Sequence, residues 1–278
     1  MKKVWFITGA AKGIGYAIAK AALEAGDYVV ATTRKENDFA VPEGYEDYAL
    51  HLLLDVSNQD ASAYTAAVEQ AVRHFGRIDI LVNNAGYARI SYFEETSEES
   101  LKEIFEVNFF GLMRVTRAVL PVMRKQRSGH IFNIASSAGY SHGPVPYHSS
   151  KFAVTGFSTS LAFEVAPFGI KVTNVIPGFV RTNFYDKGAI KEKADRSIDD
   201  YNRFRWQNQF VKKNRRHEQA GDPDKVAKLV VEASQAAKAP LHLPVTADAV
   251  KALKTWQKGI GECIDAWGRQ AGSTSFDE

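Results

Sequence analysis

The sequence predicts an α/β fold in which a doubly wound parallel sheet of about seven strands carries helices on both faces. Three observations predict it. Short apolar runs alternate along the chain with amphipathic segments of crossover length. A glycine-rich turn follows the first apolar run and leads directly into a helical pattern. No repeat, low-complexity tract or Pro/Gly/Ser-rich linker divides the 278 residues, so we expect a single domain over residues 1–278.

Composition narrows the class of protein and its partners. Hydrophobic residues make up 45% and charged residues 24%, as is ordinary for a globular chain. The net charge of +3 is too small to indicate nucleic acid or an anionic membrane as a partner. Cys263 is the only cysteine, and no apolar stretch approaches the roughly 20 residues of a membrane helix. We therefore expect a cytoplasmic protein without a membrane or nucleic-acid partner.

In the first third of the chain, apolar runs bounded by glycine or polar residues predict strands at 4–7, 27–32, 49–54 and 78–82. Helical periodicity predicts a helix over 17–25, ended by Gly26, and another over about 59–75, ended by Gly76. The polar stretch 34–44 is expected to be a loop.

In the rest of the chain, Ser97 is expected to start a long helix whose apolar face runs from Leu101 to Val119, with a kink at Pro121. Helices are also expected over about 145–166 and from Asp222 through Ala233, followed at the end of the chain by a modest helix and a polar tail from Gly272. The predicted strands are 130–135, 170–176 and 241–243. The polar, aromatic-rich stretch 182–220 is predicted to be an insertion.

The glycine-rich turn reads Thr8-Gly9-Ala10-Ala11-Lys12-Gly13-Ile14-Gly15. Between a strand and a helix, such a turn is typical of a dinucleotide site, because the backbone can approach a pyrophosphate that faces the helix N-terminus. Gly9 would allow the tight turn, and Gly13 and Gly15 the close approach. The alternative is an ordinary glycine turn.

The end of the second strand indicates which dinucleotide is preferred. An Asp or Glu about 20 residues after the glycine turn selects NAD, whereas Thr33 followed by Arg34 stands here. A guanidinium suits a 2′-phosphate, and Lys12 adds a second cation. NADP(H) is therefore favoured over NAD(H). The alternative is two solvated surface cations.

Tyr147 and Lys151 are predicted to share one face at the start of a helix, one turn apart. A free phenol has a pKa of about 10, and a nearby ammonium lowers it. A phenol tuned in this way can give a proton to a carbonyl oxygen or take one from an alcohol. By itself, the pair is more often a plain helix surface.

Taken together, the motifs resemble the short-chain dehydrogenase/reductase family, in its single-domain branch with a Rossmann-type sheet. They occur in order: the glycine turn, Asp55-Val56, Asn83-Asn84-Ala85-Gly86, Asn108, Ser136, Tyr147-x-x-x-Lys151 and Pro177-Gly178. The resemblance covers residues 3–182 well and 222–243 loosely. It implies an enzyme that acts on CH–OH and C=O groups.

The resemblance also implies roles for individual residues. Tyr147 is the general acid/base, Ser136 hydrogen-bonds the substrate oxygen, and Lys151 bonds the nicotinamide ribose and lowers the pKa of Tyr147. Asn108 anchors a water that links Lys151 to solvent. Together with the residues derived above, the predicted cofactor site comprises Gly9, Lys12, Gly13, Ile14, Gly15, Arg34, Asp55, Val56, Asn84, Ala85, Gly86, Tyr147, Lys151, Pro177, Gly178, Val180 and Thr182.

Two departures from the family pattern bear on the prediction. The loop from the serine to Tyr147 is about two residues shorter than usual, so both Ser136 and Ser137 are candidates for the active-site serine. The chain also lacks the glycine-rich ending of ketoacyl reductases, and Pro240-Leu241-His242-Leu243-Pro244 stands there instead. A hydrophobic ketone or alcohol is therefore the expected class of substrate.

The stretch 182–220 interleaves aromatic residues with lysines and arginines. Such a pattern can bind single-stranded nucleic acid, but the small net charge favours a lid that closes over an apolar substrate. His142 and His148 lie near the proposed site. No histidine spacing suits a metal, and none is expected.

The predicted function is an NADP(H)-dependent oxidoreductase that interconverts a carbonyl and an alcohol. The alternative is a catalytically silent NADP(H)-sensing protein that acts through a partner, which we would expect to have lost Tyr147 or Lys151. By analogy with the family, a homodimer or homotetramer is expected.

Overall fold

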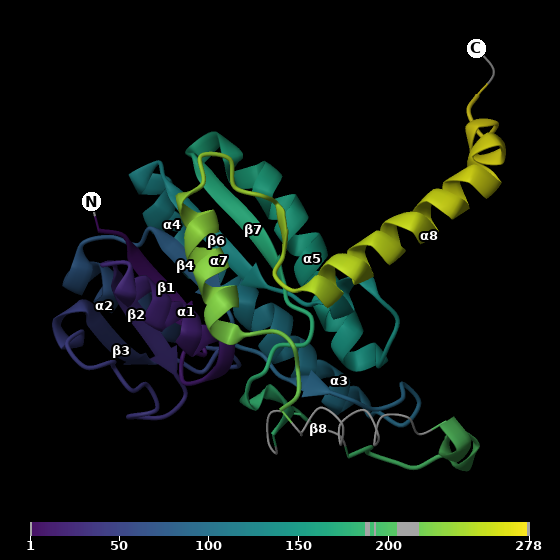
Figure 1. Cartoon of the computed structure of the whole chain (residues 1–278), viewed down its shortest axis with the longest axis horizontal. Coiled ribbons are helices and arrows are strands. Elements are labelled where there is room, and N and C mark those ends of the chain that lie inside the picture. The colour runs from purple at the N-terminus through teal and green to yellow at the C-terminus, as the bar shows by residue number, and fades with distance from the viewer. Residues whose placement is uncertain (1, 187–189, 192, 205–216, 277–278) are drawn as a thin grey trace.

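Seven parallel strands form the central sheet of the computed structural model, which describes residues 2–186, 190–191, 193–204 and 217–276. The strands are β1 (Val4–Thr8), β2 (Tyr28–Thr33), β3 (Ala49–Leu53), β4 (Ile80–Asn83), β6 (Gly129–Ile134), β7 (Ile170–Ile176) and β9 (His242–Pro244). Their order across the sheet is β3-β2-β1-β4-β6-β7-β9 (Figure 1). The order reverses direction at β1 and β4, as in a doubly wound sheet. The predicted fold class is confirmed.

Helices cover both faces of this sheet (Figure 1). On one face α1 (Gly13–Glu24) packs beside α7 (Pro223–Gln235), and on the other lie α2 (Ala61–Phe75), α4 (Leu112–Gln126) and α5 (Val145–Val165). The remaining helices are α3 (Glu98–Phe105) and α8 (Ala247–Gly272). Short 3-10 turns occupy Glu46–Tyr48, Ser137–Tyr140, Ala166–Phe168, Asn183–Tyr185 and Asp199–Phe204.

Side chains of β1 point alternately to the two faces of the sheet, and each face has its own hydrophobic core. Trp5 and Ile7 point to the core under α1 and α7, while Val4 and Phe6 point to the core under α2, α4 and α5. All four side chains are at most 1% exposed. Each buried side chain of this size contributes about 1.5–3 kcal/mol, so β1 anchors the glycine turn that follows it.

Side-chain caps set the helix starts that the sequence indicated. Ser97 accepts a hydrogen bond from the Ser100 amide at the start of α3, and Asp222 accepts from Asp224 and Lys225 at the start of α7. Gly76 ends α2 in a left-handed conformation, at φ 79°.

The structure differs from the prediction in three places. The long helix after Ser97 is interrupted by a π-helical segment, Glu106–Gly111, and α4 runs through Pro121 to Gln126. A second, two-stranded parallel sheet joins β5 (Ala88–Arg89) to β8 (Ile190–Lys191), and β8 lies inside the stretch predicted as a lid. The last helix, α8, has 26 residues and is longer than expected, although it ends at Gly272 as predicted. Within the described ranges, no helix combines the length and apolarity needed to cross a membrane.

Candidate active site

The glycine turn lies between the end of β1 and the start of α1. Gly9 and Gly13 have φ values of +64° and +62°, a region that side chains rarely adopt. A Cβ on Gly9 would lie 2.9 Å from the Cα of Ala85, and a Cβ on Gly15 would collide with the Asn84 side chain. Both positions therefore need glycine for steric reasons.

This turn is braced by Thr8, the last residue of β1, and by Asn84, which follows the neighbouring strand β4. The Asn84 side-chain amide donates to the carbonyl oxygens of Thr8 and Gly9, both at 3.0 Å. In return, the Thr8 hydroxyl oxygen accepts from the backbone amides of Asn84 at 3.0 Å and Ala85 at 3.1 Å. The predicted cofactor residues Asn84 and Ala85 thus act on the glycine turn itself, and the Asn84 amide already has two acceptors.

The residues around the turn fit a dinucleotide. Helix α1 begins without a side-chain cap and without an acidic residue in its first turn, so its backbone N–H groups and dipole favour an anion there. Ile14 packs its side chain against the core under α1. Thr182 approaches from the far side, its Cβ 3.5 Å from where a Cβ on Gly13 would lie.

Arg34 and Lys12 lie near the same end of the sheet. Thr8 pairs with Thr32 in adjacent strands, and the Ala10 amide donates to the Thr32 carbonyl oxygen at 3.1 Å. Arg34 lies two residues after Thr32 in the chain. Its side chain is exposed, and so is that of Lys12. Among the described residues neither cation has a carboxylate within 4.0 Å, so both are available to a phosphate.

Asp55 and Val56 follow β3 at the same edge of the sheet. The Asp55 carboxylate accepts from the Ser57 amide at 2.9 Å and from its hydroxyl at 2.7 Å. Val56 is 5% exposed, and its carbonyl oxygen accepts from the Tyr64 hydroxyl at 2.9 Å. These contacts hold the loop in which the adenine contacts were predicted.

Tyr147 and Lys151 occupy the first turns of α5, as predicted from their spacing. The Lys151 ammonium lies 5.9 Å from the centroid of the Tyr147 ring and donates to the Ile134 carbonyl oxygen at 2.9 Å. Ser136 follows β6 and lies close enough to the Tyr147 phenol to lower its pKa. The Ser137 amide instead donates to the Pro177 carbonyl oxygen at 2.8 Å. Of the two candidate serines, the structure brings Ser136 to the tyrosine.

The predicted lowering of the Tyr147 pKa is wrong for this structure. Burial raises the pKa of Tyr147 to about 12, and the hydrogen bond with Ser136 opposes only part of that rise. Burial also lowers the pKa of Lys151 to about 8, because its ammonium loses contact with water. At neutral pH the phenol is therefore protonated and Lys151 is a cation.

Asn108 lies in the π-helical segment, and both ends of its side chain are held. Its Oδ1 accepts from the Tyr87 amide, and its Nδ2 donates to the Tyr87 carbonyl oxygen and to the Ser150 hydroxyl, all at 3.0 Å. A Cβ on Gly86 would lie 3.0 Å from Asn108 Oδ1 and 3.8 Å from Lys151 Nζ. Asn108, Gly86 and Lys151 therefore meet at one point behind Tyr147.

The predicted cofactor segment after β7 is held by residues that the sequence analysis did not single out. The Gly178 amide donates to the Thr246 hydroxyl at 2.9 Å, and the Phe179 amide donates to Asp248 Oδ2 at 2.8 Å. A side chain at Gly178 would collide with Asp248. Val180 forms an isolated bridge with Gly221. The only sequence signal for this brace is that Thr246, which caps α8, is a good N-cap residue.

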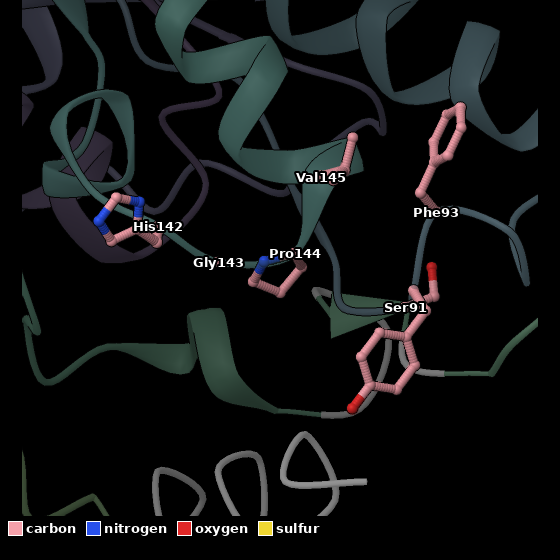
Figure 2. Close-up of a pocket in the computed structure, with 7 residues that line it drawn as sticks. Ser91, Phe93, His142, Gly143, Pro144 and Val145 are labelled. Carbon is pink, nitrogen blue, oxygen red and sulfur yellow. The ribbon is translucent and has the colours of Figure 1, made fainter. Parts of the chain in front are cut away.

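Apolar side chains surround the exposed part of Tyr147. Tyr147 and Phe184 pack against a small cluster formed by Ala88, Ile90, Tyr185 and Ile190. Next to it, a pocket of about 350 Å³ opens between the loop before α5 and the chain after β5. Figure 2 shows its walls, which are Ser91, Tyr92, Phe93, His142, Gly143, Pro144 and Val145.

The remaining sequence predictions concern two histidines near the site, the absence of a metal and the lid. His148 hydrogen-bonds through Nδ1 to the Ser141 carbonyl oxygen at 2.8 Å, and His142 is exposed at the pocket. In the described ranges no three His, Cys, Asp or Glu side chains gather as a metal site would require. The middle of the predicted lid, residues 205–216, lies outside the described residues.

Comparison with known proteins places these features in a family. Residues 3–193 match the family described as short chain dehydrogenase. A solved short-chain dehydrogenase from Streptomyces avermitilis is 37% identical with a TM-score of 0.89, and the match covers 99% of this chain and all of that one.

Two further solved structures carry a dinucleotide. A short chain dehydrogenase/reductase from Burkholderia phymatum, in complex with NAD, is 26% identical with a TM-score of 0.80, and the match covers 94% of each chain. The protein ElxO with NADP bound is 26% identical with a TM-score of 0.73, and the match covers 90% of this chain and all of that one.

Proposed function

The chain belongs to the short chain dehydrogenase family, and from this membership we propose that it is an NADP(H)-dependent oxidoreductase that interconverts a carbonyl group and an alcohol. Membership makes it an oxidoreductase that uses a nicotinamide cofactor. The preference for NADP(H), the roles of individual residues and the apolar substrate are the parts that we propose.

The preference for NADP(H) rests on Arg34 and Lys12. Both are exposed cations beside the glycine turn, and the described part of the chain offers neither of them a carboxylate partner. A 2′-phosphate would supply that partner through charge-assisted hydrogen bonds. Gly9, Gly13 and Gly15 would admit the pyrophosphate to the N-terminus of α1, and Asp55, Val56 and the loop after Asn84 would border the adenosine.

In the proposed reaction Tyr147 is the proton donor during carbonyl reduction. When bound, the nicotinamide dinucleotide supplies a hydride to the carbonyl carbon and takes it back in the reverse direction. The Tyr147 phenol gives its proton to the carbonyl oxygen, so the products are the alcohol and a phenolate. The raised pKa of Tyr147 suits this role, because the phenol stays protonated at neutral pH until charge develops on the substrate oxygen.

Ser136 and Lys151 support that proton transfer. Ser136 lies beside the phenol and can donate to the same substrate oxygen, which would hold that oxygen beside its proton donor. The Lys151 ammonium stabilises the phenolate that remains after the transfer. Asn108 is hydrogen-bonded to Tyr87 and Ser150 and completes the predicted catalytic set.

The surroundings of Tyr147 support an apolar substrate. Tyr147 packs with Phe184 against a cluster of aliphatic and aromatic side chains, and an apolar substrate would bury its own surface against the same groups. Phe184 and Tyr185 belong to the stretch predicted as a lid, so the lid contributes part of this wall.

One observation carries the proposal: Tyr147 lies beside Ser136, and the buried ammonium of Lys151 lies 5.9 Å from the centroid of its ring. The test is oxidation of NADPH in the presence of a panel of apolar ketones and aldehydes, for the wild type and for Tyr147→Phe. The variant should lose at least 100-fold in turnover and keep its affinity for NADPH. Undiminished turnover in the variant would remove Tyr147 from its role, and binding of NADPH without turnover across the panel would support a sensor.

A further inference from the structure

A second cavity lies beside the small sheet that joins β5 to β8. Its volume is about 500 Å³, and it is lined by Arg89, Ile190, Lys191, Lys193, Ala194 and Asp195. Of these residues only Ile190 also belongs to the cluster that packs with Tyr147. The proposed function therefore gives no role to the three cations and the carboxylate that border this cavity.

The small sheet separates this cavity from the active site. In its register Ala88 pairs with Ile190, and Arg89 pairs with Lys191. Successive side chains of a strand point to opposite faces, and Ala88 and Ile190 pack on the side of Tyr147. The side chains of Arg89 and Lys191 therefore point to the opposite face of the small sheet.

Arg89 is buried in the wall of the cavity, and one edge of its guanidinium is unsatisfied. Its side chain is 7% exposed. In the described part of the chain Nη1 alone makes hydrogen bonds, to the Lys193 carbonyl oxygen at 3.3 Å and to the Asp195 oxygens at 3.4 and 3.5 Å. Nε is buried and finds no acceptor among the same residues. The N–H groups of Nε and Nη2 point to one side, which is an edge that can bind a carboxylate through two parallel hydrogen bonds.

Asp195 is a weak partner for this guanidinium. Charge-assisted N–H···O bonds are usually about 2.7–2.9 Å long, so contacts of 3.4 and 3.5 Å contribute little. The same carboxylate accepts from the Ser97 amide at 2.8 Å, which holds it at the start of α3. A buried donor without an acceptor destabilises the folded chain, and a carboxylate from a ligand would supply the acceptor that Arg89 lacks.

Tyr87 adds a second unsatisfied donor on the same face. It immediately precedes β5 and lies two residues before Arg89, so the two side chains point the same way. Its hydroxyl is buried and has no hydrogen-bond partner within the described ranges. Lys191 Nζ lies 5.0 Å from the centroid of the Tyr87 ring. One face of the small sheet thus carries two unsatisfied donors and an ammonium.

The charges around the cavity favour an anion with a single charge. Lys191 forms an ion pair with Glu103, and Asp195 is paired weakly with Arg89. Lys193 is exposed, and no carboxylate of the described residues lies within 4.0 Å of its ammonium. Three cations therefore face two carboxylates, which leaves one positive charge. A carboxylate balances that charge, whereas a doubly charged phosphate would be repelled more strongly by Asp195.

We propose that this cavity binds the carboxylate of a small organic acid, at a site separate from the active site. Arg89 binds the carboxylate through its Nε and Nη2 edge, and Lys193 binds it through its ammonium. The cavity is larger than a single ion, and Ala194 and the alkyl chain of Lys191 border it, so the acid carries a short apolar chain. Because residues 190–195 belong to the stretch predicted as a lid and Arg89 lies on β5, the bound acid holds that stretch to β5.

Calorimetric titration with hexanoate tests the site on the full chain. NADPH is bound first, so that the phosphate sites of the cofactor are filled, and sodium chloride of the same ionic strength is the reference. We expect one hexanoate per chain, and weaker binding of both acetate and inorganic phosphate. The absence of saturable hexanoate binding up to about 20 mM, or tighter binding of phosphate than of hexanoate, would overturn the proposal.

Substitutions that change charge locate the site. Lys193→Met should raise the dissociation constant of hexanoate about fivefold, and Lys228→Met, at an exposed position of α7, is the matched control that should leave it unchanged. Asp195→Asn removes the competing negative charge and keeps an acceptor for the Ser97 amide, so it should tighten binding about fivefold. Arg89→Met should weaken binding at least tenfold. Because Arg89 is buried, the two variants at exposed positions decide the test if Arg89→Met does not fold.

Unchanged affinity in Lys193→Met, or weaker binding in Asp195→Asn, would refute the site. A purely structural tie between Arg89 and Asp195 predicts no tightening in the second variant, so the direction of that change distinguishes a binding site from a structural ion pair.

The titration does not depend on the proposed activity. The dissociation constant of hexanoate should be the same with and without NADPH, and it should be unchanged in Tyr147→Phe, because the small sheet lies between the two sites. Loss of hexanoate binding when NADPH is bound, or in Tyr147→Phe, would place the acid in the active site and refute a separate one. Hexanoate binding without any oxidation of NADPH would refute only the proposed function.

Discussion

The Lys151 ammonium on α5 donates a hydrogen bond of 2.9 Å to the carbonyl oxygen of Ile134, the last residue of β6. Lys151 is 6% exposed and Ile134 is 7% exposed. This contact ties the helix that carries Tyr147 to the strand that leads into Ser136. The contact also holds the Lys151 ammonium in a buried site. Burial there lowers the pKa of Lys151 to about 8, so the charge of the lysine changes close to neutral pH.

We expect carbonyl reduction to be lost as the pH rises above about 8. Burial lowers the pKa of Lys151 to about 8, so below that pH the lysine is cationic and above it the charge disappears. The value of kcat/KM should be constant from pH 6 to 7 and then fall about tenfold per unit on the alkaline side. The apparent pKa belongs to the Tyr147 and Lys151 pair.

Lys151→Arg supplies the control for this profile. A guanidinium keeps its charge to far higher pH, so the variant should lack the alkaline limb, whatever its absolute activity. A wild-type profile that stays level to pH 9.5 would show that the lysine charge is not needed.

Ser136 and Ser137 should differ sharply when each is changed to alanine. Ser136 lies beside Tyr147, and loss of a donor at a developing oxyanion costs about 100- to 1,000-fold in rate. Ser137→Ala should stay within about twofold of the wild type. Because Ser136 also caps the Ala138 amide at 3.1 Å, thermal unfolding should accompany the kinetics. Similar rates for the two variants would contradict the assignment.

Arg34→Ala should shift cofactor preference toward NADH. A hydrogen bond to a charged group contributes about 1.5–3 kcal/mol, so kcat/KM for NADPH should fall roughly 10- to 100-fold while the value for NADH changes little. Lys35→Ala removes a neighbouring cation as the matched control and should leave the ratio of the two values unchanged. A constant ratio in Arg34→Ala would exclude Arg34 from the 2′-phosphate site.

The motif residues could be predicted from sequence because each has a local signature. The glycine turn lies between a strand and a helix, and Tyr147 and Lys151 are one helical turn apart, so their placement depends on a few neighbouring residues. The brace by Thr246 and Asp248 could not be predicted, because those residues are about 70 positions from Gly178 and meet it only through the order of β7 and β9.

The pKa of Tyr147 was mispredicted for a related reason. Its sequence neighbourhood contains the lysine that should lower the pKa, whereas the burial that raises it comes from residues spread along the chain. The length of α8 was underestimated because its glycines argue against a helix.

Thr8 should be essential to the shape of the glycine turn. Its hydroxyl oxygen accepts from the amides of Asn84 and Ala85. Thr8→Val keeps the volume and leaves both donors unsatisfied, at a cost of about 1–3 kcal/mol. Urea unfolding should show that loss, and the dissociation constant for NADPH should rise, while Thr8→Ser should restore both. A fully stable Thr8→Val would mean that the two amides find other acceptors.

His130 should make the protein unstable in acid. It is 4% exposed on β6, where its Nε2 pairs with the Thr173 hydroxyl at 2.8 Å, and burial lowers its pKa from 6.5 to about 3. Between those two pH values the unfolded chain binds a proton that the folded chain does not. The free energy of unfolding therefore falls as the pH falls from 6.5 toward 3, by about 1.4 kcal/mol per unit at most.

His130→Gln removes this proton uptake and retains a polar group for Thr173. The free energy of unfolding in urea, measured at pH 6.5 and pH 4.5, should fall by roughly 2 kcal/mol less in this variant than in the wild type. His74→Gln, on the exposed end of α2, leaves His130 in place and should keep the wild-type difference. If His130→Gln loses as much stability in acid as the wild type does, then the acid sensitivity comes from other groups and the buried imidazole does not control it.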